Sequence, residues 1–257
     1  MRSLDTTYLN DETERQYIAF LLKPITPEQM RNDLNKFMTQ ELSTKSTCGL
    51  KFLYYFVFRD MLDVKGRYGN YWDICYNWDN HMSKQYIRNF ADTVFKKNVS
   101  NPSFTIYHLI NEVARLYLYQ SIHIMKPAFI LSILERFNPT KVLDPCAGWG
   151  SRLLACMRYG CGYIGFETNR KLKACYDAIQ EEACFEGTDV TIRMQDCLEG
   201  MADFKNQYDM VLTSPPYYNY ECYEAMPLRT KEEWHRWYIT VFRMAFDKNL
   251  NRYHGKA

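Results

Sequence analysis

Short apolar runs alternate with longer amphipathic stretches in the second half of the chain. Four runs have the length and apolar character of strands, at residues 142–143, 163–166, 190–194 and 210–212. Helical spacing of apolar residues follows at 151–159, 170–184 and 231–246. Alternation of strands with helices is typical of a parallel sheet covered by helices. We therefore expect an α/β fold in this half.

The first half shows helical spacing and no strand alternation. Helices are predicted within the polar stretch 1–45 and at residues 83–97, 105–119 and 126–137. Thr26 and Pro27 have the features of a helix start, since proline is favoured at the first helical position. We expect a mainly helical N-terminal region, residues 1–115, followed by an α/β domain, residues 116–257.

Charge and cysteine usage narrow the class of protein. The 257 residues carry a net charge of +2, so the chain is no basic tail-like binder. The nine cysteines include no Cys-x-x-Cys pair, and the histidines have no metal-ligand spacing. We expect reduced thiols, no metal site, and a cytoplasmic location, or the nucleus or another compartment of a host cell for a viral protein. The polar first ten residues and the short apolar runs predict no signal core and no membrane partner.

Two turns that follow predicted strands carry the candidate chemistry. After the first strand comes Asp144-Pro145-Cys146-Ala147-Gly148-Trp149-Gly150, an acid followed by a Gly-x-Gly turn. After the fourth comes Thr213-Ser214-Pro215-Pro216-Tyr217, a stiff corner because proline fixes φ and lacks an N–H donor. Ligands of open α/β sheets bind beyond the carboxyl ends of the strands, so we expect both turns to face one site.

These two motifs together resemble those of the amino-methyltransferases, which use S-adenosylmethionine to methylate exocyclic amines of DNA bases. The family motif has phenylalanine where this chain has Cys146. The resemblance covers roughly residues 120–245. It implies a Rossmann-like methyltransferase sheet, S-adenosylmethionine as cofactor, DNA as partner, and a role such as restriction–modification.

The resemblance also implies the residues that hold the cofactor. Glu167 follows the second strand, where an acid commonly accepts hydrogen bonds from both ribose hydroxyls. Asp196 would accept from the adenine amine, and Asp144 would bind the amino end or order the glycine turn. Arg152 would reach a phosphate or lie in solvent. The full expected set is Asp144, Pro145, Cys146, Ala147, Gly148, Gly150, Glu167, Thr168, Asp196, Cys197 and Lys126, with Lys126 at the helix entry near the methionine end.

The catalytic residues implied by the resemblance are Ser214, Pro215, Pro216 and Tyr217. The serine hydroxyl and the Pro215 carbonyl would accept the two hydrogens of the target amine, and Tyr217 would stack on the flipped base. Tyr218 and Tyr220 would extend this aromatic edge or pack within the loop. Serine at the first motif position favours cytosine over adenine as the methylated base.

Alternatives stay open at this stage. The substrate could be RNA or a protein amide, or the chain could be a catalytically incomplete subunit that binds cofactor or nucleic acid. The family's sheet needs about three further strands; we expect a truncated chain, a shortened relative, or a partner that supplies them. The N-terminal region is either a helical cap or a nucleic-acid face, whose cations and rings would be Lys51, Arg59, Lys65, Arg67, Lys84, Arg88, Lys96, Lys97, Tyr54, Tyr68, Tyr71, Trp72 and Trp78.

Overall fold

A computed structural model describes most of the chain, and its described residues fall into two compact units. The described residues are 9–65, 69–115, 122–183, 187–216, 218 and 230–247. One unit comprises Met1–Ile25, Phe58–His123 and Asn219–Glu224, and the other comprises Thr26–Val57, Ile124–Tyr218 and Ala225–Ala257. The expected Tyr217 and Tyr220 lie outside the described residues, as do Arg67 and Tyr68.

The α/β unit contains a four-stranded sheet in which every pair of strands is parallel, as the alternating pattern predicted. Its strands are β1 (Lys141–Asp144), β2 (Gly162–Phe166), β3 (Val190–Arg193) and β4 (Met210–Val211). Their order is β3-β2-β1-β4, with Leu143 in register with Ile164 on one side and Val211 on the other. The carboxyl ends of all four strands therefore lie at one edge of the sheet.

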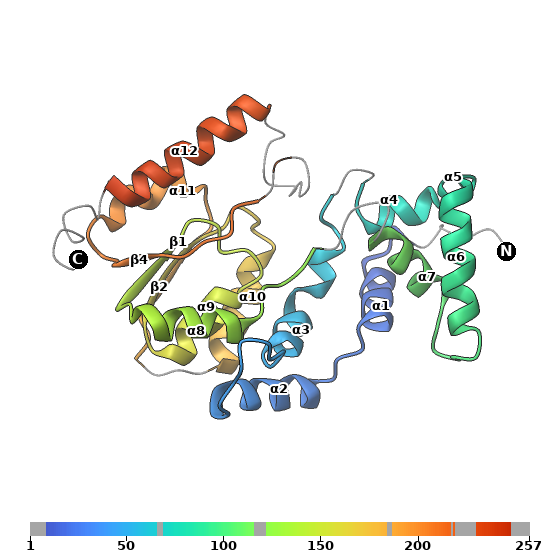
Figure 1. Ribbon diagram of the computed structural model, residues 1–257, viewed down its shortest axis with the longest axis horizontal. Coiled ribbons are helices and arrows are strands. Elements are labelled where there is room, and N and C mark those ends of the chain that lie inside the picture. Colours follow the sequence, from blue (N-terminus) through green and yellow to red (C-terminus); the bar gives the residue numbers. More distant parts are fainter. Residues whose placement is uncertain are drawn as a thin grey trace. The chain divides into compact units, whose positions relative to one another are not determined.

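Helices cover both faces of this sheet (Figure 1). On one side lie α8 (Pro127–Phe137) and α9 (Ser151–Tyr159), and α10 (Leu172–Ala183) packs against α9. On the other side, α11 (Cys197–Gly200), the 3-10 helix η2 (Met201–Phe204) and α12 (Lys231–Asp247) form one core with β1 and β2. The fully buried residues at the centre of that second core are Leu143, Ile164 and Met201. The central strands β1 and β2 thus bury side chains on both faces of the sheet.

One carboxylate ties the amino ends of β1 and β4 together. Asp209 accepts hydrogen bonds from the backbone N–H groups of Thr140, at 2.9 Å, and Lys141, at 3.0 Å, and from the Thr140 hydroxyl, at 2.8 Å. Burial by itself would raise the pKa of Asp209, but these hydrogen bonds hold it below the ordinary value. The interaction fixes the register of β1 and β4 at the edge opposite the candidate site.

Part of the expected N-terminal region belongs to the α/β unit. This segment contains α2 (Pro27–Thr39), which starts at Thr26 with the predicted proline, and the start of α3 (Leu50–Met61). Phe37 and Phe52 are fully buried, and Arg158 of α9 donates to the Phe37 carbonyl. The compact units therefore differ from the expected division at residue 115, because this segment buries its apolar side chains with the sheet's own helices.

The other unit is helical. It comprises the last residues of α3 together with α1 (Glu12–Leu22), α4 (Tyr71–Tyr76), α5 (Trp78–Met82), α6 (Gln85–Asn98) and α7 (Ile106–Val113). Its core includes Ile18, Tyr71, Trp72, Ile87 and Leu109. Among the described helices of the whole chain, none has both the length and the apolar character needed to cross a membrane.

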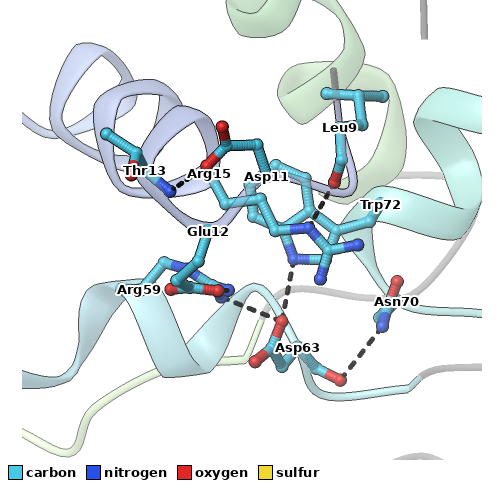
Figure 2. A network of polar contacts seen from close by, with 9 residues as sticks. All are labelled: Leu9, Asp11, Glu12, Thr13, Arg15, Arg59, Asp63, Asn70 and Trp72. Carbon is cyan, nitrogen blue, oxygen red and sulfur yellow. Dashed lines mark hydrogen bonds and ion pairs between the residues drawn. The ribbon is translucent and has the colours of Figure 1, made fainter. Parts of the chain in front are cut away.

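A buried tryptophan organises the polar contacts of the helical unit (Figure 2). The Trp72 indole N–H donates to Asp63 at 2.8 Å, and Arg59 forms ion pairs with Asp63, at 2.9 Å, and Glu12, at 2.7 Å. The guanidinium carbons of Arg15 and Arg59 lie 5.0 and 5.1 Å from the centre of the Trp72 ring, within cation–π range. These contacts connect α1 to the segment between α3 and α4.

The described rings of the expected nucleic-acid face are mostly core residues. Tyr71, Trp72 and Trp78 are at most 3% exposed, so they cannot stack on bases without unfolding. Arg59 is engaged by two carboxylates of its own unit. Tyr71, Trp72 and Trp78 are therefore core residues of the helical unit, and their rings do not form an exposed nucleic-acid face in this structure. Their aromatic and basic pattern reflects packing of the helices against one another.

Candidate functional site

The glycine turn leaves the end of β1 and enters α9 in a backbone conformation that favours glycine. Gly148 has φ of +58° and Gly150 has φ of +80°, both in the left-handed region. A β-carbon on Gly150 would lie only 2.9 Å from Cδ1 of Ile179 in α10. Gly150 therefore serves two purposes, the tight turn and the close packing of the turn on α10.

A buried ion pair between Asp144 and Arg152 is hydrogen-bonded to the backbone of this turn. Asp144 is fully buried at the end of β1, and its Oδ2 lies 2.5 Å from Nε of Arg152, which is 5% exposed. The Tyr163 hydroxyl donates to the same oxygen at 2.7 Å, and the N–H of Cys146 donates to Oδ1 at 3.2 Å. Arg152 also donates to the carbonyls of Cys146 and Ala147. The carboxylate and guanidinium thus bind the backbone of the turn at several points.

The two buried charges of Asp144 and Arg152 compensate each other. Burial by itself would lower the pKa of Arg152, but the neighbouring Asp144 carboxylate raises it above its ordinary value. Burial raises the pKa of the Tyr163 hydroxyl well above its ordinary value, so that group stays a hydrogen-bond donor. The three side chains form a fixed, charged support for the turn.

The buried ion pair bears on the roles that were expected for Arg152 and Asp144. Arg152 was expected to reach a phosphate or to lie in solvent, and it does neither, because it is buried against Asp144. Asp144 was expected either to bind the amino end of a cofactor or to order the turn. Its complete burial and its bonds to Arg152, Tyr163 and Cys146 place it in the second role.

The peptide of Gly148 is held from both sides. Its N–H donates to Glu167 Oε2 at 2.9 Å, and its carbonyl accepts from the Tyr176 hydroxyl of α10. Glu167 Oε1 accepts from the N–H of Asn169 at 2.8 Å. Burial raises the pKa of Glu167, and the backbone donors partly offset this. Glu167, expected to bind ribose, therefore lies directly beside the expected cofactor turn, and Thr168 follows it.

Asp196 begins the short helix α11 after β3. Its Oδ1 accepts from the N–H of Leu198 at 2.9 Å and receives a longer contact, 3.5 Å, from the Trp237 indole N–H of α12. Cys197 is buried in the core formed by α11 and α12, and Cys146 of the glycine turn packs against that core. Burial raises the pKa of Cys197 to about 12, so its thiol stays protonated at neutral pH.

The proline corner follows β4 and is anchored by α12. The N–H of Leu212 donates to the Leu143 carbonyl at 3.0 Å, which continues the pairing of β4 with β1. Ser214, Pro215 and Pro216 are half-buried. The Trp234 indole N–H donates to the Pro216 carbonyl at 3.3 Å, and the ring centres of Trp234 and Tyr218 lie 5.9 Å apart. The corner is therefore fixed by both the sheet and a helix.

The structure brings most expected cofactor residues to one edge of the sheet. The glycine turn contacts Glu167, and the strand before the turn is hydrogen-bonded to the strand before the proline corner. Lys126 instead directs its ammonium group to the Lys45 carbonyl, at 3.0 Å. In the described part of the chain, no group of three or more His, Cys, Asp or Glu side chains could hold a metal ion.

The sequence did not predict the site contacts of four aromatic residues. Trp234 and Trp237 lie in the predicted helix 231–246, and their indole N–H groups contact the corner and Asp196. Tyr163 and Tyr176 are ordinary core aromatics in sequence, and only the fold shows their hydroxyls at Asp144 and Gly148. No local signal distinguishes these hydrogen-bonding aromatics from others in a chain with 21 tyrosines and five tryptophans.

Comparison with known proteins adds no family assignment. No protein-family model, no curated protein and no solved structure matches this chain.

Proposed function

We propose that this chain binds S-adenosylmethionine at the carboxyl ends of β1–β3 and transfers its methyl group to an exocyclic amine of a DNA base. The observation that carries the proposal is the hydrogen bond, 2.9 Å long, between Gly148 in the turn after β1 and Glu167 after β2. β1 also pairs with β4, the strand that leads into Ser214-Pro215-Pro216. The acid proposed to bind ribose, the glycine turn and the corner proposed to bind the amine thus follow neighbouring strands at one sheet edge. DNA as the substrate comes from the motif resemblance.

The hydrogen-bond acceptors at this edge fit a nucleoside cofactor. Glu167 accepts the backbone N–H groups of Gly148 and Asn169, and a carboxylate has about four lone-pair sites, so a further one can accept a ribose hydroxyl. Asp196 offers a carboxylate to an adenine amine in the same way. Glycine at 148 leaves the turn without a side chain where a ligand would approach. In addition, Thr213 has a buried hydroxyl without a partner among the described residues.

The amine would be activated by the corner after β4. A base amine is a poor nucleophile because its lone pair is delocalised into the ring. Ser214 Oγ and the Pro215 carbonyl would each accept a hydrogen bond from one N–H of the amine and stabilise positive charge as it forms on nitrogen. When bound, S-adenosylmethionine would supply the methyl group by breaking of its methyl–sulfur bond, with S-adenosylhomocysteine as the leaving group and the methylated nitrogen losing one proton to solvent. The chain would contribute mainly by positioning these two acceptors for the amine. The hydrogen bond from Trp234 to the Pro216 carbonyl and the pairing of β1 with β4 hold the corner in place.

Serine at position 214 favours cytosine as the target, which makes cytosine-N4 methylation the proposed reaction and adenine-N6 methylation its closest variant. The base must leave the duplex or come from a single strand, because the amine cannot be reached within a stacked helix. Tyr217, outside the described residues, would stack on it.

Transfer of tritium from labelled S-adenosylmethionine to single-stranded DNA, RNA and a mixed peptide tests this proposal. We expect labelled DNA, and a loss of about 100-fold or more in Ser214→Ala, because one charge-stabilising acceptor is removed. Ser103→Ala, at an exposed serine of the helical unit, is the matched control and should keep full activity.

Other outcomes separate the alternatives. Label in RNA or peptide alone would replace DNA as the substrate while keeping the chemistry. Binding of S-adenosylmethionine without transfer to any acceptor would identify a cofactor-binding subunit. Undiminished DNA methylation by Ser214→Ala would refute the catalytic assignment.

A further inference from the structure

Thr213 has a buried hydroxyl that the fold does not explain. Its Oγ1 is buried and has no hydrogen-bond partner in the described part of the chain. Buried polar groups are nearly always paired, and an unpaired one is destabilising, so each exception calls for a reason. Thr213 directly precedes Ser214 at the carboxyl end of β4. An unpaired hydroxyl at a ligand-binding edge suggests a partner that comes with the ligand.

The position of this hydroxyl follows from the strand. The pairing of β4 with β1 continues through Leu212, whose N–H donates to Leu143, so the backbone is still extended before Thr213. Side chains two residues apart in a strand lie on the same face. Val211 packs into the core that contains Trp237 and borders Cys146. Thr213 therefore lies on the α12 face of the sheet, one strand away from the glycine turn.

The order of the strands indicates which part of a cofactor reaches it. Glu167 follows β2 and Asp196 follows β3, and both strands lie on one side of β1. Thr213 follows β4, on the other side. A cofactor whose ribose binds Glu167 and whose adenine binds Asp196 must extend its remaining end across the glycine turn toward β4. That end of S-adenosylmethionine is its amino acid, with an ammonium and a carboxylate group.

We infer that the Thr213 hydroxyl binds the amino-acid end of the cofactor and so positions its sulfonium beside the Ser214 corner. The inference rests on the proposed function and adds a positioning residue to it. A hydroxyl suits this role because it can donate to the carboxylate or accept from the ammonium group. Among the described residues the hydroxyl has no partner, and the cofactor's amino-acid end would supply one on binding.

Two ligands and two variants test the assignment by calorimetry. S-adenosylhomocysteine carries the amino-acid end, whereas 5′-methylthioadenosine has the same nucleoside and thioether without it. Thr213→Val keeps the shape and removes the hydroxyl. We expect it to weaken S-adenosylhomocysteine about tenfold, the effect of one hydrogen bond to a charged group, and to leave 5′-methylthioadenosine unchanged. Thr213→Ser should restore most of the affinity.

Thermal unfolding without ligand gives an independent readout. The melting temperature of Thr213→Val should equal or exceed that of the wild type, because a methyl group replaces an unpaired hydroxyl. A clearly lower melting temperature, an equal loss of affinity for both ligands, or no loss for either would overturn the assignment. If the wild type binds neither nucleoside, the proposed function itself fails and the role of Thr213 falls with it.

Discussion

The Asp144–Arg152 pair holds the glycine turn through contacts within the chain. An ion pair this deeply buried is stabilising only when its remaining hydrogen-bonding groups are satisfied. Here Tyr163, the N–H of Cys146 and the carbonyls of Cys146 and Ala147 provide those partners. Single residues thus fix the backbone at which the proposed cofactor binds.

Replacement of Arg152 by methionine should therefore be strongly destabilising. It leaves the Asp144 carboxylate buried without its counter-charge, which costs about 3–5 kcal/mol of the free energy of unfolding. Urea denaturation measures the loss. Arg136→Met, at an exposed arginine of α8, is the control and should change stability by less than about 0.5 kcal/mol. A small effect of Arg152→Met would show that the pair does not support the turn.

Glu167 and Asp209 should give opposite pH dependences of stability. The pKa of Glu167 is raised in the fold by burial, so the native protein holds its proton more tightly than the unfolded chain does. Its contribution to stability is present below the ordinary pKa of glutamate and is lost as pH rises through the raised folded value. Burial by itself would raise the pKa of Asp209, but its hydrogen bonds outweigh this effect and lower the pKa. Its contribution is present above the ordinary pKa and is lost as pH falls through the lowered folded value.

Denaturation of the wild type, Glu167→Gln and Asp209→Asn across the acidic range checks both signs. The wild type should lose stability relative to Glu167→Gln as pH rises. It should gain stability relative to Asp209→Asn over the same change. Parallel curves for the two comparisons would contradict the environments described for these carboxylates.

The apolar pattern of the sequence predicted most helices and strands of the α/β unit, but not their order in the sheet or the contacts between them. Apolar runs predicted β1 to β4 because buried parallel strands need continuous apolar residues. The helical spacing likewise predicted α8, α9 and α12. The strand order and the ties from Trp234 and Tyr176 could not be predicted, because they depend on which distant segments pack together. The burial of Arg152 was missed for the same reason, since a charged residue in a first helical turn usually faces water.

Helix α12 should influence the proposed reaction through Trp234. Trp234→Phe keeps a ring against Tyr218 and removes the hydrogen bond to the Pro216 carbonyl. A looser corner should reduce methyl transfer about tenfold with little change in cofactor affinity, because positioning of the acceptors is lost. Phe242→Leu, about two turns further along the same helix, is the control. Equal rates for wild type and Trp234→Phe would show that the corner is held by other contacts.

Over the whole molecule, the chain combines an α/β unit that carries every described candidate site residue with a helical unit built around Trp72 (Figures 1 and 2). The first unit includes residues 26–57, which the sequence grouped with the helical region because amphipathic helices do not reveal which core they join. The aromatic and basic residues of the helical unit were the least informative in sequence. Packing and nucleic-acid contact use the same side chains.

Analysis of nucleosides from treated DNA tests the central claim most directly. Cytosine-rich single-stranded DNA is incubated with the protein and S-adenosylmethionine, digested, and examined by mass spectrometry for methylated nucleosides. The proposed site predicts N4-methylcytosine from the wild type and at least about 100-fold less from Ser214→Ala. No methylated nucleoside from the wild type, or as much from Ser214→Ala as from the wild type, would contradict it.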